Sequence, residues 1–189
     1  KMRGDVRDTN VSLLANGFVF SGNLKSDENG EITGVRLDRL FLENQLDLFG
    51  DLTRTESGAI DIRVNGPFLN AAPMVDGLFA SGSELPPIFG DVRFQSRIDS
   101  MRLKEGYELS DVSFDLNFAG PVMEALSLKG TDRRGGEVEV GLSATSENER
   151  SLTASVSDTG DLLSGLFGTD FVQGGKMNIS GFVRSGGQP

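Results

Sequence analysis

The chain has 189 residues, a formal net charge of −10 from 28 acidic and 18 basic residues, and neither cysteine nor histidine. The negative charge argues against nucleic acid as a partner, because that affinity depends on lysine and arginine neutralising phosphates. Without cysteine and histidine, the chain lacks thiol nucleophiles, disulfides and the usual general base near neutral pH. We therefore expect a protein that is not an enzyme and that holds neither a cofactor nor a metal.

The first third of the sequence alternates apolar and polar residues with the period of a β-strand. Residues 11–24 predict a hairpin around the Asn16-Gly17 turn, and the acidic stretch at 26–31 predicts the next turn. That stretch has a composition similar to a calcium loop but lacks the terminal bidentate glutamate, which favours an ordinary turn. Further strands are expected at 32–38, 40–52 and 59–65, with one apolar and one wet face.

The alternation breaks at residues 66–82, where Phe68, Ala72, Val75 and Phe79 would share one face of a helix. Gly66-Pro67 and Gly82 punctuate this stretch, although Pro73 argues against an ideal helix. The proline-rich residues 83–90 then predict a linker back to the sheet.

The second half returns to strand alternation. Val92, Phe94 and Ile98 share a parity that Met101 and Leu103 do not, which predicts a bulge or bend near Asp99-Ser100. Strands follow at 107–118, 121–129 and 137–144, and Arg133-Arg134 should occupy a solvated hairpin tip.

Residues 151–185 predict a strand, one short helix and a final strand. Asp158 or Thr159 is the expected N-cap, because its side-chain oxygen can accept a free backbone N–H of the first turn. Gly168 is placed to end the helix in a left-handed conformation. Asp158-Thr159-Gly160 is also the triplet of aspartic proteases, where two such carboxylates share a proton. A single copy could act only in a homodimer, so the cap is the favoured interpretation.

These elements predict a mainly β fold, an antiparallel meander of about ten strands with two short helices. Such a sheet would be about 50 Å wide, and it could form a curved sheet, a groove or a two-layer sandwich. We expect residues 1–189 to be a single β-rich segment of a longer protein. A weak internal repeat relates about 10–90 to 91–185, since each half carries a Gly-Leu-Phe triplet.

The apolar face of this sheet is the only functional candidate of any size. Its residues either line a groove that faces lipid or form a closed core, and the pattern alone favours the closed core. The candidates are Phe18, Phe20, Leu46, Leu48, Ile60, Ile62, Phe94, Phe114, Leu116, Phe118, Val138, Val140 and Leu142.

Three stretches carry a resemblance to a known family. YELSDVSFDLNFAGPVMEALSLKG (107–130), GGEVEVGLSA (135–144) and LTASVSDTGDLLSGLFGTDFVQGGKMNISG (152–181) resemble the AsmA-like C-terminal region of YhdP-type proteins, relatives of TamB in Gram-negative bacteria. The segment IRVNGPFLNAAPMVDGLF (62–79) is similar to another element of that family, with Asn70 where an aspartate is more usual.

The resemblance implies the periplasmic portion of a protein anchored in the inner membrane by an N-terminal helix that this chain lacks. It implies a lipid-transfer scaffold with phospholipid as partner, supporting the barrier of the outer membrane. The alternative is a structural or partner-binding periplasmic β module with a closed core and no ligand. An aspartic-type hydrolase is the third hypothesis.

Overall fold

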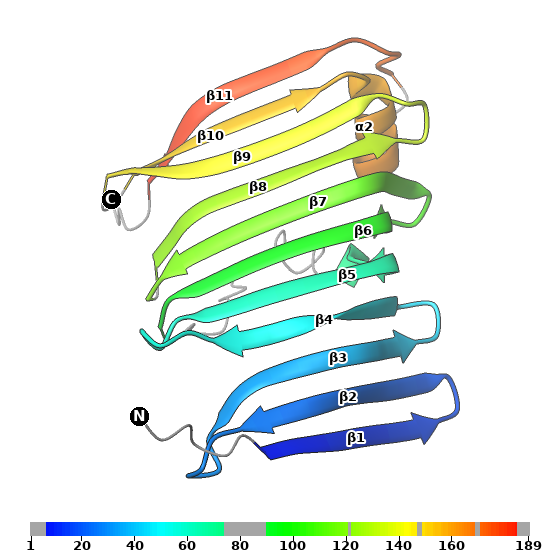
Figure 1. Cartoon of the computed structure of the whole chain (residues 1–189). Coiled ribbons are helices and arrows are strands. Elements are labelled where there is room, and N and C mark those ends of the chain that lie inside the picture. The colour runs from blue at the N-terminus through cyan, green and yellow to red at the C-terminus, as the bar shows by residue number, and fades with distance from the viewer. Residues whose placement is uncertain (1–6, 74–89, 121, 147–148, 169–170, 185–189) are drawn as a thin grey trace.

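The computed structural model describes residues 7–73, 90–120, 122–146, 149–168 and 171–184, which form one open eleven-stranded sheet and a short helix (Figure 1). The spatial order of the strands follows the chain from β1 to β11, so the predicted mainly β meander is confirmed. The elements are β1 Arg7–Ala15, β2 Phe18–Ser26, β3 Ile32–Leu42, β4 Leu46–Arg54, β5 Ile60–Asn70, β6 Val92–Lys104, β7 Tyr107–Ala119, β8 Val122–Asp132, β9 Glu137–Ser146, β10 Glu149–Val156, α2 Thr159–Phe167 and β11 Met177–Arg184.

The meander is interrupted once, where β5 and β6 pair in parallel. All other neighbouring strands pair antiparallel. Antiparallel neighbours can be joined by a tight turn, whereas a parallel pair needs a long crossover. The chain has 21 residues between the end of β5 at Asn70 and the start of β6 at Val92, which is long enough for such a crossover. This gives a physical reason for the break in alternation at this point of the sequence.

The helix predicted at 66–82 is wrong for its first five residues, which continue the preceding strand. Residues 66–70 belong to β5, and Phe68 pairs with Asp47 and Ser100. The register between β4 and β5 shifts between Asp47 and Phe49, opposite Gly66-Pro67. A proline is tolerated at such a bulge because no ladder hydrogen bond is lost there. Residues 74–82 and most of the 83–90 linker lie outside the described residues.

One further boundary differs from the sequence prediction, and one predicted break in parity is found with its bulge on the next strand. The expected strand at 40–52 is divided by a turn at Asn44, which has a φ of 59° and closes the β3–β4 hairpin. Asparagine tolerates this left-handed conformation, so the turn forms without glycine. The change of parity expected at Asp99-Ser100 is present, since Ile98 and Met101 are both buried, but the bulge itself lies on the neighbouring strand β7. There the register shifts between Ser110 and Ser113, and Asp111 has a φ of 51°.

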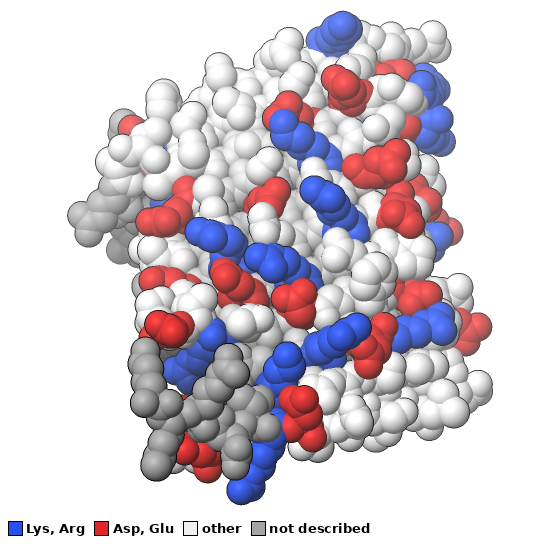
Figure 2. Space-filling view, viewed as in Figure 1, with Lys and Arg blue, Asp and Glu red and all other residues white. Residues whose placement is uncertain are grey.

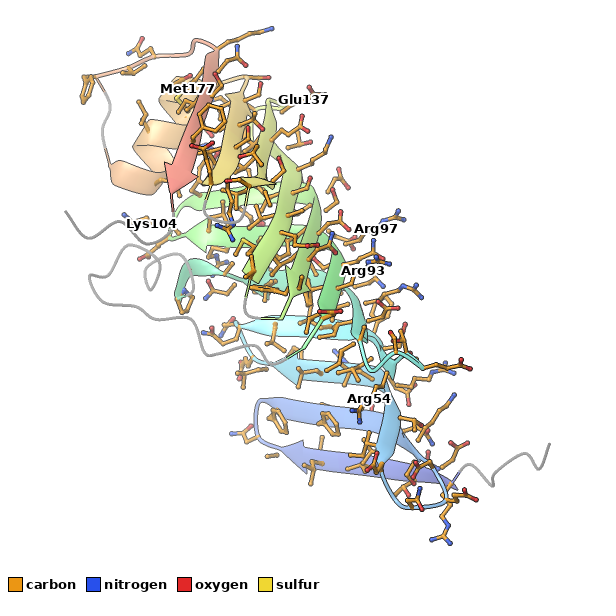
Figure 3. The ribbon with its side chains drawn as sticks, turned by 90° about the vertical axis from the view of Figure 1, so that its left-hand side faces the viewer. Arg54, Arg93, Arg97, Lys104, Glu137 and Met177 are labelled. Atoms are coloured by element: carbon orange, nitrogen blue, oxygen red, sulfur yellow. The ribbon has the colours of Figure 1, made fainter. Side chains whose placement is uncertain are left out.

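The two faces of the sheet differ in chemistry. Lysine, arginine, aspartate and glutamate are interspersed over the polar face (Figure 2). Seen from the side, Arg93, Arg97 and Glu137 project from that face, while Met177 and α2 lie on the opposite, apolar face (Figure 3). The strand period of two therefore separates charged and apolar side chains, as the sequence predicted.

One end of the apolar face is covered by α2. Leu162 and Leu166 of the helix pack against a buried cluster on the sheet. This cluster includes Leu48, Ile98, Met101, Tyr107, Leu109, Val112, Val138 and Val156. The helix is too short to be stable alone, so its docking on these residues must supply most of its stability.

Candidate functional site

An unbroken row of apolar side chains crosses the part of the apolar face that α2 does not cover. Cross-strand pairing places one residue from each of nine consecutive strands, β2 to β10, in the same register. We call this set the apolar row: Leu24, Val35, Leu52, Ile62, Phe94, Leu116, Leu126, Leu142 and Leu152. Nine strands at about 4.8 Å spacing make the row about 38 Å long, perpendicular to the strands.

The burial of the apolar row differs from that of a protein core. Each of its members is partly buried, and none reaches the burial of Ile98 or Leu109, which are 2% and 0% exposed. Side-by-side neighbours within the sheet cover part of each side chain, but no described element packs on top. The row is thus a strip of apolar surface that stays accessible from one side.

The register places all thirteen sequence-predicted candidates on the apolar face. Leu48 and Val138 are buried, and both belong to the buried cluster against which α2 packs. The other eleven are partly buried, and Ile62, Phe94, Leu116 and Leu142 are members of the apolar row. Phe94 and Phe114 also meet edge to face, with ring centroids 5.8 Å apart.

Five members of the row were not among the sequence candidates: Leu24, Val35, Leu52, Leu126 and Leu152. Their strand parity was visible, since Leu52 shares a face with Leu46 and Leu48. What the sequence could not supply was the register between strands, because a cross-strand partner depends on turn lengths and bulges.

The Asp158-Thr159-Gly160 triplet is a helix cap in the structure. Asp158 Oδ1 accepts a hydrogen bond from the backbone N–H of Asp161 at 2.9 Å. This hydrogen bond, together with a contact at 3.1 Å from Arg134 to Asp158 Oδ2, lowers the pKa of the Asp158 carboxyl below its ordinary value. Gly168 ends the helix at φ 67°, and both ends of α2 therefore agree with the sequence prediction.

The β8–β9 turn fastens the helix to the sheet. Arg133 and Arg134 occupy a solvated hairpin tip, as expected, and their side chains also contact the first turn of α2. Arg133 Nε donates to Asp161 Oδ1 at 2.7 Å, and Arg134 Nε lies 3.4 Å from the same oxygen. The Asp161 side chain is fully buried. At the other end of α2, Lys104 Nζ donates to the Leu166 carbonyl at 2.6 Å.

Beneath this ionic contact lies Tyr107, which is 1% exposed. Burial, together with the charges of Asp132 and Asp161, raises the pKa of its hydroxyl, so Tyr107 is neutral at physiological pH. A neutral buried tyrosine and an N-capping aspartate with a lowered pKa suit a structural contact. A shared-proton carboxylate pair would require the opposite shift for one carboxyl.

The described residues include no cluster of three or more acidic side chains with the geometry of a metal site. Within the same residues, no helix has the length and apolar character needed to cross a bilayer. Comparisons with protein-family models, curated proteins and solved structures gave no match. The fold and the apolar row therefore assign the chain only to a structural class: an open β-sheet with one apolar face, one end of which is covered by a helix.

Proposed function

We propose that the chain is a segment of a lipid-transfer scaffold, in which the apolar row shields phospholipid acyl chains from water. The observation that carries the proposal is the partial burial of a row that continues across nine strands. A closed core would bury these side chains, whereas a strip that takes up acyl chains must leave them accessible.

The dimensions of the row suit an acyl chain. The hydrocarbon core of a bilayer is about 30 Å thick, so one leaflet contributes about 15 Å. A row of about 38 Å therefore offers more than the length of one acyl chain. Burying a methylene contributes about 0.8 kcal/mol, so sixteen carbons crossing water face a barrier of roughly 13 kcal/mol, which contact with the row would largely remove.

The opposite face supports the same proposal. Its interspersed charges and the net charge of −10 keep that side hydrated while the apolar side holds the ligand. The resemblance of residues 107–130 and 152–181 to YhdP-type proteins adds the proposed setting, the periplasmic portion of a protein anchored in the inner membrane. There the scaffold would pass phospholipid towards the outer membrane and support its barrier.

A partner-binding β module is the second candidate function. Among the described strands, β1 and β11 pair on one side only, and both expose apolar side chains. Leu14 is 82% exposed on β1, and Phe182 is 67% exposed on β11. Edge strands of this kind can pair with a strand of another chain.

Lipid analysis of the purified protein distinguishes the two candidates. The protein is expressed in a Gram-negative host, extracted with organic solvent and analysed for phospholipid by mass spectrometry. We expect bound phospholipid in the wild type and about a tenfold loss in Leu126→Asn, because the row loses one buried apolar contact and gains an amide. Ser127→Asn is the matched control on the polar face and should retain the lipid. Absence of phospholipid from the wild type at any stoichiometry contradicts the proposal.

A further inference from the structure

Four phenylalanines of the described strands lie on the otherwise polar face: Phe41, Phe49, Phe68 and, on the edge strand β11, Phe182. Arginine covers two of them. The guanidinium of Arg39 lies 5.0 Å from the ring centroid of Phe41, and that of Arg102 lies 5.2 Å from the ring centroid of Phe68. In the part of the chain that the structure describes, Phe49 has no such cover, and it is 49% exposed. Phe49 is thus an apolar ring that the protein presents to solvent on its wet side.

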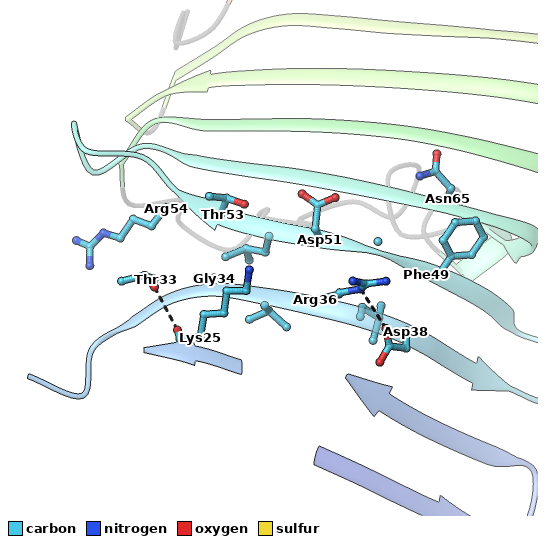
Figure 4. Close-up of a pocket in the computed structure, with 14 residues that line it drawn as sticks. Lys25, Thr33, Gly34, Arg36, Asp38, Phe49, Asp51, Thr53, Arg54 and Asn65 are labelled. Carbon is cyan, nitrogen blue, oxygen red and sulfur yellow. Dashed lines mark hydrogen bonds and ion pairs between the residues drawn. The ribbon is translucent and has the colours of Figure 1, made fainter. Parts of the chain in front are cut away.

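The Phe49 ring borders a hollow of about 850 Å³ over β3 and β4 (Figure 4). Among the side chains that line this hollow on the polar face are Lys25, Arg36, Phe49, Asp51, Thr53 and Asn65. Asn65 is the direct cross-strand neighbour of Phe49, so an amide stands beside the ring. Gly34 helps to form the hollow, because it contributes no side chain between Lys25 and Thr53, its neighbours on either side.

Two charges in the hollow are not engaged by the described residues. Arg36 is paired with Asp38 at 3.2 Å, whereas neither Lys25 nor Asp51 has an ion pair within the described part. The aliphatic stem of Lys25 passes beside Gly34. A Cβ added to Gly34 would lie 4.0 Å from the Cβ and from the Cδ of Lys25. The hollow therefore holds one available ammonium and one available carboxylate beside an uncovered aromatic ring.

This set of groups constrains the chemistry of a ligand. A ligand in a shallow hollow remains partly hydrated, so it must itself be polar. To stack on the Phe49 ring, the ligand needs one flat apolar surface. The C–H face of a sugar ring provides such a surface. Sugar hydroxyls both donate and accept hydrogen bonds, which suits Asp51 as acceptor, Arg36 as donor and Asn65 as both. The ammonium of Lys25 adds a preference for an acidic group.

We propose that this hollow is a binding site for a glycan whose sugars carry a carboxylate. The ring of one sugar stacks on Phe49, its hydroxyls bond to Asp51 and Asn65, and its carboxylate meets Lys25. The site lies on the face opposite the apolar row, so it does not rest on the proposed lipid function. A chain with both sites would hold a lipid on one face and a polar sugar polymer on the other.

Two disaccharides that differ by one acidic group test the proposal. The first probe is N-acetylglucosaminyl-N-acetylmuramic acid, which carries a carboxylate, and the second is the neutral N,N′-diacetylchitobiose. In an NMR titration of the full chain, we expect the acidic disaccharide to shift the amide signals of β3, β4 and β5 with a dissociation constant of about 1 mM or tighter. The neutral disaccharide should bind about fivefold more weakly, since it forms no ion pair with Lys25.

Two variants separate the contributions of ring and charge. Phe49→Ser should weaken both disaccharides about fivefold, whereas Lys25→Gln should weaken the acidic one alone. Lys129→Gln, which removes a lysine of the same face on β8, is the control and should bind like the wild type. The proposal is overturned if neither disaccharide gives saturable shifts at about 10 mM, ten times the expected constant. Equal affinity for the two probes, or unchanged binding by Phe49→Ser, overturns it as well.

Discussion

The covered end and the open row of the apolar face are built from the same types of apolar side chain, but the side chains of the two regions differ in burial. Under α2, Leu109 and Val112 are 0% and 1% exposed, while on the same strand Leu116 of the row is only partly buried. Strand propensity and alternation are alike in both regions. The difference comes from one short helix, which shows that the alternation defines an apolar face and that a covering element decides whether this face becomes core.

The largest contrast is expected from truncating one leucine in each region. Leu109→Ala should lower the free energy of unfolding by about 2–5 kcal/mol, because it leaves a cavity in a packed cluster. Leu126→Ala in the open row should cost about 1 kcal/mol or less, since solvent reaches the site and no closed cavity forms. Urea unfolding of the two variants measures the difference. Equal losses would show that the row is buried as deeply as the covered end.

A glycine in the helix sharpens the contrast further. Gly165→Ala would normally stabilise a helix by about 1 kcal/mol. Here the new Cβ would lie 2.1 Å from Cδ2 of Tyr107, within the ring of a buried side chain. We therefore expect a loss of about 1–3 kcal/mol in urea unfolding, because the helix must shift off the sheet.

Gly141→Ala is the control for this substitution. Its new Cβ would meet the movable Oγ1 of Thr153 at 2.9 Å, and it should therefore change the unfolding free energy little. Stabilisation by Gly165→Ala would contradict the close packing of α2 on Tyr107.

The ionic contact of the β8–β9 turn should contribute less than the packing. Arg133→Gln leaves the buried Asp161 carboxylate with Arg134 alone, so we expect a loss of about 1–2 kcal/mol in the free energy of unfolding. In a double-mutant cycle with Asp161→Asn, we expect a stabilising coupling energy between the two side chains, so that the two losses are not additive. Independent, additive losses would mean that the turn does not hold the helix through this pair.

The smallest effect concerns acid pH. The pKa of Asp158 is lowered in the folded protein, first by the hydrogen bond from the backbone of Asp161 and then by Arg134. Its contribution is therefore present above the ordinary carboxyl pKa of about 3.9 and is lost as the pH falls through the folded value. The unfolding temperatures of the wild type and Asp158→Asn should differ near pH 6 and converge as the pH falls through the lowered pKa of the folded protein. A constant difference across this range would contradict the shift.

Much of the fold could be predicted from residue patterns. The alternation over residues 112–118 indicates a strand with one apolar face, and Asp158 and Gly168 mark both ends of the helix. The parallel pairing of β5 with β6 could not be predicted, because alternation does not depend on strand direction. The Asn44 turn was missed because it uses neither glycine nor proline.

The two candidate sites differ in how far they could be predicted. The apolar face was identified from strand parity, but its division into a covered end and an open row depends on where α2 docks. The contact of Arg133 with Asp161 joins residues 28 positions apart, so no local pattern reports it. In contrast, Phe49 stands among polar residues of its own parity in the stretch Leu46–Leu52. That out-of-phase aromatic residue was a visible signal of the hollow on the polar face.

Photo-crosslinking at matched positions tests the central claim most directly. A benzophenone amino acid is placed at Leu126 of the open row, at Val138 of the covered end or at Ser127 of the polar face. The protein is then irradiated in Gram-negative cells and analysed by mass spectrometry. We expect phospholipid adducts at Leu126 and none at the other two positions. Protein adducts without lipid at Leu126, or equal lipid labelling at all three positions, would contradict the account.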